Sequence, residues 1–346
     1  MSLFEQLIGT QTGLVAAFLL TALLVVLTGI RLSIYGDALG DRTGLGSGLV
    51  GLIFLAAVTS LPELVVSLTS VLQNADPHQG ADLAVGNMLG SNVFNLLILA
   101  LMALLAPHYF KPKNLKKPHT AEILYGLILL LLFSAAFWGA GKLPLVPWLE
   151  CSILTLLLPI AYAFILRREH QNQKMAKIEE KPEEEQALAH LSPLRFYTVL
   201  SLLCALIIIG GILLSILGSR MALPAAQGGF ALEASLIGTL FLAVSTSLPE
   251  LVISFSSIRL GFLDMAVGNV LGSNIFNLLI IFVSDIAMRK TDLLQTASSK
   301  HGASVGLILL LTLLSILLLR TKTKKKTLTV AAIMLIAYVV SFIFFE

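Results

Sequence analysis

The segment FLAAVTSLPELVVSLTS (54–70) decides the fold, because a close copy of it returns as FLAVSTSLPELVISFSS (241–257). The two copies agree at 12 of 17 positions. Each is followed by a second repeated segment, and DLAVGNMLGSNVFNLLI (82–98) and DMAVGNVLGSNIFNLLI (264–280) agree at 14 of 17 positions. Chance does not produce two such matches. The chain therefore contains an internal repeat, and its two halves are expected to share one fold.

The composition indicates that most of this chain is surrounded by lipid. Of 346 residues, 57% are hydrophobic and 12% are charged, and the mean hydropathy is +0.91. A soluble domain usually has about a quarter charged residues, so a soluble chain this apolar could not cover its surface. The two cysteines form no CxxC or Cys/His cluster, which argues against a disulfide framework or a zinc site.

Apolar runs long enough to cross a bilayer recur along the chain. We expect spans at 13–34, 46–73, 81–105, 121–140, 147–167, 196–218, 230–258, 265–287, 302–320 and 328–345. The longest polar break, 168–195, contains KIEEKPEEEQ and is expected to be a solvated linker. The predicted fold is an all-α polytopic membrane protein of ten transmembrane helices, divided into repeats at 1–167 and 196–346 and the linker 168–195.

Five spans per half is an odd number, so the second half enters the membrane from the opposite side. The two halves are therefore expected to form inverted five-helix repeats. This architecture is typical of transporters, whose ion or substrate site lies near the midplane between the repeats. Interrupted helices at matched positions are the best pointer to that site, and Pro62 and Pro249 occupy such positions.

Basic residues predict the orientation of the chain. With the N-terminus outside, 18 of the 23 Lys and Arg fall on the inner side, against five outside. We therefore expect both termini outside and the 168–195 linker in the cytoplasm. The basic stretches 111–117 and 320–326 flank spans, so we interpret them as topology signals, with lipid headgroup contacts or nucleic-acid binding as alternatives. A chain of this kind suits a prokaryotic cytoplasmic membrane.

The repeated prolines predict exposed backbone carbonyls. Proline has no N–H and clashes with the carbonyl four residues earlier, so carbonyls near Val58 and Ser245 are expected to be freed. Glu63 and Glu250 follow the prolines directly. A carboxylate at bilayer depth costs roughly 2.5–3.5 kcal/mol on insertion scales, so two at matched sites indicate a function rather than an accident.

Oxygen-bearing side chains accompany each glutamate on two successive predicted helices. Thr59 and Ser60 share one helix face with Glu63, as Thr246 and Ser247 do with Glu250. In the span that follows, every fourth position of one face is polar, namely Asn87, Ser91 and Asn95 in the first half and Asn269, Ser273 and Asn277 in the second. Carboxylate, hydroxyl, amide and carbonyl oxygens suit hard cations such as Ca²⁺ and Na⁺. The GxxxG spacings, Gly86 with Gly90 and Gly268 with Gly272, are typical of close helix packing.

TSLPE followed by GNxxGSNxxN, present twice, resembles the sodium/calcium exchanger branch of the calcium/cation antiporter superfamily. The resemblance covers essentially the whole chain. It implies that the second, third, seventh and eighth spans form the ion core, and that Glu63 and Glu250 bind Ca²⁺ and Na⁺ alternately. It also implies ligand roles for Thr59, Ser60, Ser91, Asn95, Thr246, Ser247, Ser273 and Asn277, and backbone-carbonyl roles for Ala56 and Ala243.

One position departs from the family pattern. Many members have an acidic residue where this chain has Asn277, so the site has two motif carboxylates rather than three. This weakens the case for potassium co-transport and leaves the sodium stoichiometry open. The acidic motif of the proton/calcium branch is absent, which favours Na⁺ as the driving ion. Proton coupling stays open because buried carboxylates also bind protons.

We therefore expect a secondary antiporter that exchanges Na⁺ for Ca²⁺ by alternating access. The alternatives are an antiporter of the same fold with H⁺ as driving ion or another divalent cargo, and a cation channel, which the repeat disfavours. HExxH, GxSxG and paired-aspartate motifs are absent, so we do not expect an enzyme. The expected partners are the transported ions and the bilayer, with no resident cofactor and no nucleic acid. The sequence leaves the oligomeric state open.

Overall fold

The structure is a computed structural model that describes residues 9–74, 76–111, 115, 119–139, 145–146, 151–173, 188, 191–223, 229–230, 245–288 and 291–345. Most of the predicted linker 168–195 and the predicted ligand Ala243 lie outside these residues. Helices make up nearly all of the described part. In the first half they are α2 (Gln11–Thr43), α3 (Gly46–Leu49), a π-helical stretch η1 (Val50–Leu55), α4 (Ala56–Thr59), α5 (Leu61–Gln73), α6 (Pro77–Leu105), α7 (Thr120–Gly139) and α8 (Ile153–Gln173).

The second half contains a comparable series of helices. They are α10 (Pro193–Ala222), α12 (Leu248–Arg259), α13 (Leu263–Met288), α14 (Leu293–Thr296), α15 (His301–Leu319) and α16 (Lys324–Phe345). A short antiparallel strand pair, β1 (Leu145–Val146) and β2 (Cys151–Ser152), precedes α8 and pairs Leu145 with Ser152. The predicted span at 147–167 was therefore wrong at its start, because residues 151–152 pair as a strand before the helix begins.

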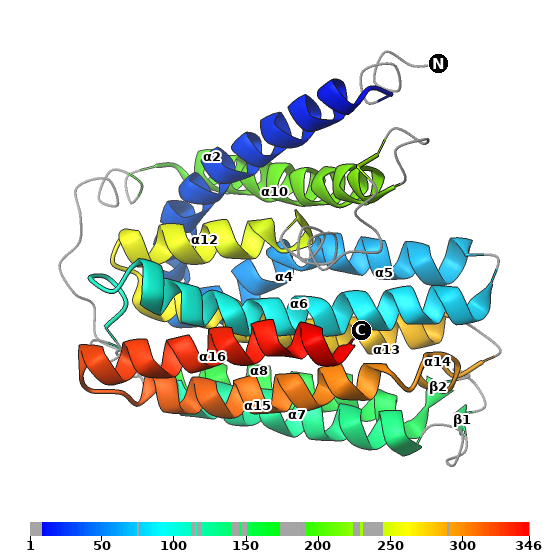
Figure 1. Ribbon diagram of the computed structural model, residues 1–346. Helices are drawn as coiled ribbons and strands as arrows, with labels where there is room; N and C mark the ends of the chain where they lie inside the picture. Colours follow the sequence, from blue (N-terminus) through cyan, green and yellow to red (C-terminus); the bar gives the residue numbers. More distant parts are fainter. Residues whose placement is uncertain are drawn as a thin grey trace.

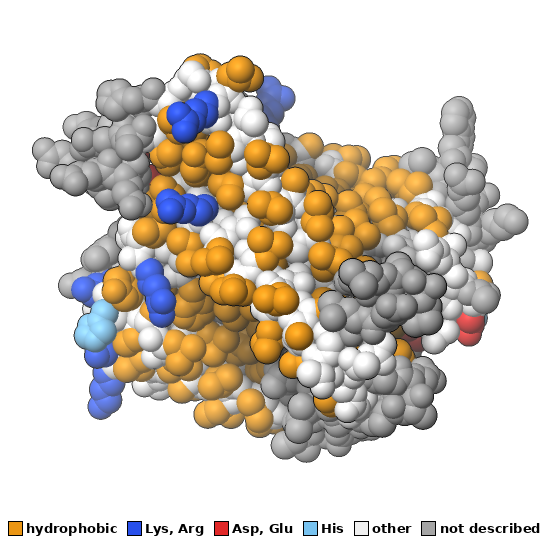
Figure 2. Space-filling model, turned by 90° about the horizontal axis from the view of Figure 1, so that it is seen from above, with side chains coloured by type: hydrophobic (Ala, Val, Ile, Leu, Met, Phe, Trp, Pro, Cys, Tyr) orange, Lys and Arg blue, Asp and Glu red, His pale blue; other side chains and the backbone are white. Residues whose placement is uncertain are grey.

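Within the described part of the chain, seven helices are long and apolar enough to cross a membrane, which confirms an all-helical polytopic membrane protein. They cover 11–43, 46–73, 77–105, 121–139, 193–221, 263–288 and 301–319. The other predicted spans fall on α8, on α12, which follows residues outside the described part, and on α16. Figure 2 shows why lipid is the natural surrounding, since hydrophobic side chains cover the middle of the face and Lys and Arg lie toward one side.

The helices form a layered bundle around α6 and α13 (Figure 1). Helix α13 packs against α6, η1, α5, α7 and α8, while α6 also packs against α15 and α16. Helices α2 and α10 pack on each other along the opposite side of the bundle, and α2 also contacts α12. The core helices α6 and α13 are thus shielded on both sides. Accordingly, 78% of the most apolar stretch of α6 and 72% of that of α13 are buried inside the protein.

Both TSLPE segments contain a helix break at the position that the sequence indicates. Helix α4 ends before Ser60 (φ −89°, ψ 2°) and α5 begins after it, while Ser247 (φ −98°, ψ 18°) precedes α12. Pro62 and Pro249 consequently lie in a first helical turn, where a missing N–H breaks no helical hydrogen bond. Both prolines approach Gly211 of α10, where an added Cβ would lie 2.5 Å from Cγ of Pro62 and 3.3 Å from Cγ of Pro249.

Close packing at one GxxxG pair is confirmed. A Cβ at Gly268 would lie 2.6 Å from the carbonyl oxygen of Gly48, and one at Gly272 would overlap the carbonyl oxygen of Leu52. Helix α13 therefore crosses α3 and η1 backbone to backbone. A Cβ at Gly90, the counterpart of Gly272, meets no atom of the described residues within 4 Å.

Two histidine–aspartate pairs join the halves of the chain. The Nε2 atom of His119 lies 2.9 Å from Oδ1 of Asp264, and that of His301 lies 3.2 Å from Oδ1 of Asp82. Residues 119 and 301 are separated by the same 182 positions as residues 82 and 264. Each aspartate lies in the first half of its long helix, α6 or α13, and each histidine lies at the beginning of α7 or α15. The repeat thus extends from the motifs to the contacts that anchor them.

We expect His119→Gln to remove a pH-dependent part of the stability. Burial lowers the pKa of His119, but hydrogen bonds and charges from Asp264 and Glu122 outweigh it and raise the pKa to about 9. This contribution is fully present below the unfolded pKa of about 6.5 and is lost as pH rises through 9, an effect of about 3 kcal/mol. The apparent Tm of the wild type in detergent should therefore fall between pH 7 and pH 10, and that of His119→Gln should stay flatter.

His301→Gln is the matched control, because its pair with Asp82 is more exposed. The side chains of the His119 pair are 2% and 9% exposed, against 18% and 42% for the His301 pair. An equally steep pH dependence in His119→Gln and in the wild type would contradict a charged His119–Asp264 pair.

Candidate functional site

The two repeated glutamates are buried where the interrupted helices restart. Glu63 lies in the first turn of α5 and Glu250 in the first turn of α12, and each side chain is 1% exposed. The partial positive charge of a helix N-terminus stabilises a carboxylate in its first turn. The local TSLPE sequence thus positions a carboxylate at a helix break inside the protein.

Contacts between the halves bring the two TSLPE segments together with α13. The hydroxyl group of Ser60 donates a hydrogen bond to Oε1 of Glu250 at 3.3 Å. The hydroxyl groups of Thr59 and Ser273 lie 3.4 Å apart. Residues of the first repeat therefore contact the glutamate and the serine of the second, so the predicted residues of the two halves contribute to one site.

Several buried oxygens of this site have no hydrogen-bond partner in the described part of the chain. They are both carboxylate oxygens of Glu63, Oε2 of Glu250, the hydroxyls of Ser91 and Ser247, and the side-chain carbonyls of Asn95, Asn269 and Asn277. Leaving a buried polar group unpaired costs about 1–3 kcal/mol, and more for a charged group. Such oxygens are concentrated among the predicted ligands. They are the ligand atoms that a cation without its hydration shell requires.

Two asparagines hold the backbone of the glutamates. The Asn87 amide donates to the carbonyl oxygen of Glu63 at 3.3 Å and to the Ser67 hydroxyl at 3.0 Å. The Asn269 amide makes the matching contacts, to the Glu250 carbonyl at 3.5 Å and the Ser254 hydroxyl at 3.0 Å. Both side chains therefore position the glutamate-bearing helices, and a ligand role for their amide oxygens stays a prediction.

Ser67 and Ser254 were missed by the sequence interpretation. A signal was present, because both lie one turn after a glutamate and share the 187-residue offset of the TSLPE segments. Asn92 was also missed, although its side-chain oxygen accepts a hydrogen bond of 3.0 Å from the Asn277 amide. Asn92 belongs to the repeated GSN sequence, so its match with Asn274 could have identified it.

The remaining predicted ligands differ in how they are placed. The carbonyl oxygen of Ala56 already accepts from the Thr59 hydroxyl at 3.3 Å and from the Ser60 N–H at 3.0 Å. Thr246 is half-buried, and Ser247 lies at the helix break before α12. Asp285 accepts from the Thr155 hydroxyl at 2.7 Å and from the Leu293 N–H at 2.8 Å.

The chemistry of the site is that of oxygen alone. Its described members carry carboxylate, hydroxyl and amide groups, and no group of three or more His, Cys, Asp and Glu gathers in the described part of the chain. Thiolate and imidazole ligands favour zinc and copper, whereas oxygen ligands favour hard cations such as Ca²⁺ and Na⁺. An all-helical bundle of membrane spans with such a centre has the chemistry expected of a membrane protein that handles hard cations.

A comparison with protein families assigns the chain to one family of membrane proteins. The model of the family described as "Sodium/calcium exchanger protein" matches residues 13–167 and 194–345. The chain therefore belongs to the sodium/calcium exchanger branch of the calcium/cation antiporter superfamily, which is a family of membrane transporters rather than enzymes.

Individual relatives agree with this assignment. The chain is 33% identical to "Inner membrane protein YrbG" of Escherichia coli over 278 residues, 77% of each chain. It is 27% identical over 289 residues to "Sodium/calcium exchanger MaX1" of Methanosarcina acetivorans, covering 71% of this chain and 74% of the relative. The fold resembles a solved structure of the sodium-calcium exchanger NCX_Mj with a TM-score of 0.70 at 22% identity, covering 96% of this chain and 99% of that one.

Proposed function

We propose that this protein is a secondary active Na⁺/Ca²⁺ antiporter in which the two ions compete for one site built around Glu63 and Glu250. The observation that carries the proposal is the set of unpartnered buried oxygens on Glu63, Glu250, Ser91, Asn95 and Asn277. Family membership and the similarity to the sodium/calcium exchanger MaX1 support Na⁺ and Ca²⁺ as the ions.

The charge of the site supports exchange rather than leak. Two carboxylates carry a charge of −2, which one Ca²⁺ neutralises. Moving an uncompensated charge through a low-dielectric barrier is unfavourable, so the loaded site should change sides more easily than the empty, doubly negative one. After Ca²⁺ is released on one side of the membrane, the site can then return to the other side only when Na⁺ has bound in its place.

We further propose that ten spans form two inverted repeats around this site, with both termini outside and the linker 168–195 in the cytoplasm. The matched contacts of Asn87 and Asn269, and of His301 and His119, support an equivalent fold of the two halves. The distribution of Lys and Arg supports the orientation. Both prolines pack on Gly211 of α10, which supports a motion in which α2 and α10 slide past the core.

Uptake of ⁴⁵Ca²⁺ into proteoliposomes tests the proposal. Vesicles loaded with Na⁺ and diluted into Na⁺-free medium should accumulate Ca²⁺, while vesicles loaded with K⁺ should not. A third set with an imposed pH gradient and no Na⁺ separates proton coupling. Uptake driven only by the pH gradient would replace Na⁺ by H⁺ as the driving ion, and uptake that needs no counter-ion would indicate a channel.

A further inference from the structure

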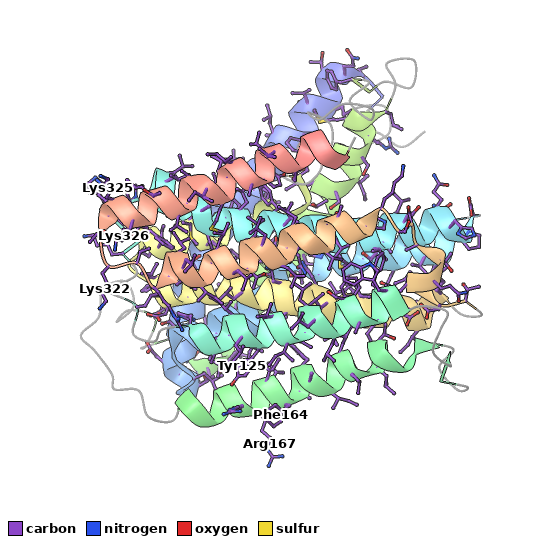
Figure 3. The ribbon with its side chains drawn as sticks, turned by 60° about the horizontal axis from the view of Figure 1, so that its bottom comes forward. Tyr125, Phe164, Arg167, Lys322, Lys325 and Lys326 are labelled. Atoms are coloured by element: carbon purple, nitrogen blue, oxygen red, sulfur yellow. The ribbon has the colours of Figure 1, made fainter. Side chains whose placement is uncertain are left out.

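A second site lies at the end of the bundle, away from the two glutamates. A cavity of about 230 Å³ opens between the segment that follows α6 and the turn that joins α15 to α16. Lys111 enters it from the first segment, and Lys322 and Lys324 enter it from the second. The fold therefore brings Lys111, the first residue of the basic stretch 111–117, close to the basic stretch 320–326, which begins 209 residues later. Figure 3 shows Lys322 at this end, with Lys325 and Lys326 nearby.

The cavity is positively charged and offers hydrogen-bond donors. Its lining consists of Ala103, Pro107, His108, Phe110, Lys111, Thr321, Lys322, Thr323, Lys324, Thr327 and Leu328, which include three lysines and no acidic residue. None of these lysines forms an ion pair with another described residue. Helix α16, which is 22 residues long, begins at Lys324, so the positive end of its dipole adds to the lysine charges. The site is therefore built for an anion.

The surroundings of the cavity favour an anion that is attached to a lipid. Ala103, Phe110 and Leu328 form an apolar part of the lining. Leu105 and Tyr109, which lie at the end of α6 and just after it, are 72% and 52% exposed. An exposed leucine at a helix end, followed four positions later by an exposed tyrosine, is typical of the boundary between acyl chains and headgroups. Basic pockets between spans at this level bind anionic headgroups.

We propose that this cavity binds the phosphate group of an anionic glycerophospholipid through Lys111, Lys322 and Lys324. The acyl chains then lie in the bilayer beside Leu105. The site is independent of the ion site, because its residues belong to neither the TSLPE nor the GSN segments. A negative result in the ion-exchange experiment would therefore not contradict the proposed lipid site.

Native mass spectrometry of the detergent-purified full chain, titrated with phosphatidylglycerol, tests the proposal. The double variant Lys322→Gln/Lys324→Gln should bind the first lipid at least about tenfold more weakly than the wild type, since it removes two charge-assisted contacts to the phosphate. The matched control is Lys325→Gln/Lys326→Gln, which removes the same charge from the same helix end without touching the cavity. It should change the affinity less than about twofold, because these two lysines do not line the cavity and contribute only screened long-range attraction.

Further arms distinguish the source of the phosphate and guard against a folding defect. Lys111→Gln, on a separate segment, should also weaken binding, while phosphatidylcholine should bind wild type and variants alike. Equal losses in the cavity variant and the control would overturn the proposal, because the charge alone would then explain binding. Glycerol phosphate that binds as tightly as the lipid would overturn the lipid as the ligand.

Discussion

Glu250→Gln and Glu63→Gln are each expected to reduce Na⁺-dependent ⁴⁵Ca²⁺ uptake by about 100-fold or more. Each substitution preserves the shape of the side chain and removes one of two buried charges. Truncating one partner of a buried charge contact costs roughly 2–5 kcal/mol, and every 1.4 kcal/mol is tenfold. A site with one carboxylate would also leave bound Ca²⁺ with an excess positive charge, which opposes its passage through the barrier.

A transport-independent measurement separates loss of binding from loss of folding. Neither oxygen of Glu63 has a hydrogen-bond partner in the described part of the chain, so removing its charge should preserve or raise the Tm in Ca²⁺-free buffer. Ca²⁺ that binds the folded state raises the Tm of the wild type, and this increase should disappear in both variants. Full Ca²⁺-dependent stabilisation in Glu63→Gln would contradict the proposed site.

Glu122→Gln serves as the matched control for these variants. It also removes a buried carboxylate, but Glu122 lies outside both repeated motifs, and its Oε1 lies 3.5 Å from Nδ1 of His119. This variant should keep the Ca²⁺-dependent increase in Tm even if its Tm in Ca²⁺-free buffer is lower. The comparison therefore distinguishes the site carboxylates from buried carboxylates in general.

The sequence was sufficient to predict those features that the repeat encodes locally. The helix breaks at Ser60 and Ser247 follow from Pro62 and Pro249, because a proline costs no helical hydrogen bond in a first turn but removes one in a helix interior. The burial of both glutamates follows from their apolar context. That the two halves contribute to one site was also predicted, and the Ser60–Glu250 contact agrees with it.

Features that depend on contacts between segments could not be predicted in the same way. His119 lies at the beginning of a helix, where the sequence has no periodicity that would indicate its partner. The contact between His119 and Asp264 is therefore visible only in the fold. Lys111 and Lys322 line the same cavity only because of the way in which α6 packs against α15 and α16. The start of α8 at Ile153 could not be predicted, because a short apolar run is compatible with either a strand or a buried helix.

Gly272→Val is expected to destabilise the protein by about 3 kcal/mol or more, and Gly272→Ala by less. A Cβ at this position would overlap the carbonyl oxygen of Leu52 and lie 2.7 Å from Cβ of Ala56. Neither atom can rotate away, as the tip of a flexible side chain could, so α13 must separate from η1 and α4. Separation of these helices would also break the contact between Thr59 and Ser273, and thus the ion site.

Gly306→Ala in α15 is the matched control, because a Cβ there meets no atom of the described residues within 4 Å. Alanine favours a helix over glycine by up to about 1 kcal/mol, so this variant should be as stable as the wild type or slightly more stable. Apparent Tm and the yield of monodisperse protein in detergent measure both effects. If Gly272→Val were as stable as Gly306→Ala, α13 would not cross η1 backbone to backbone, and the arrangement that brings Ser273 to Thr59 would be wrong.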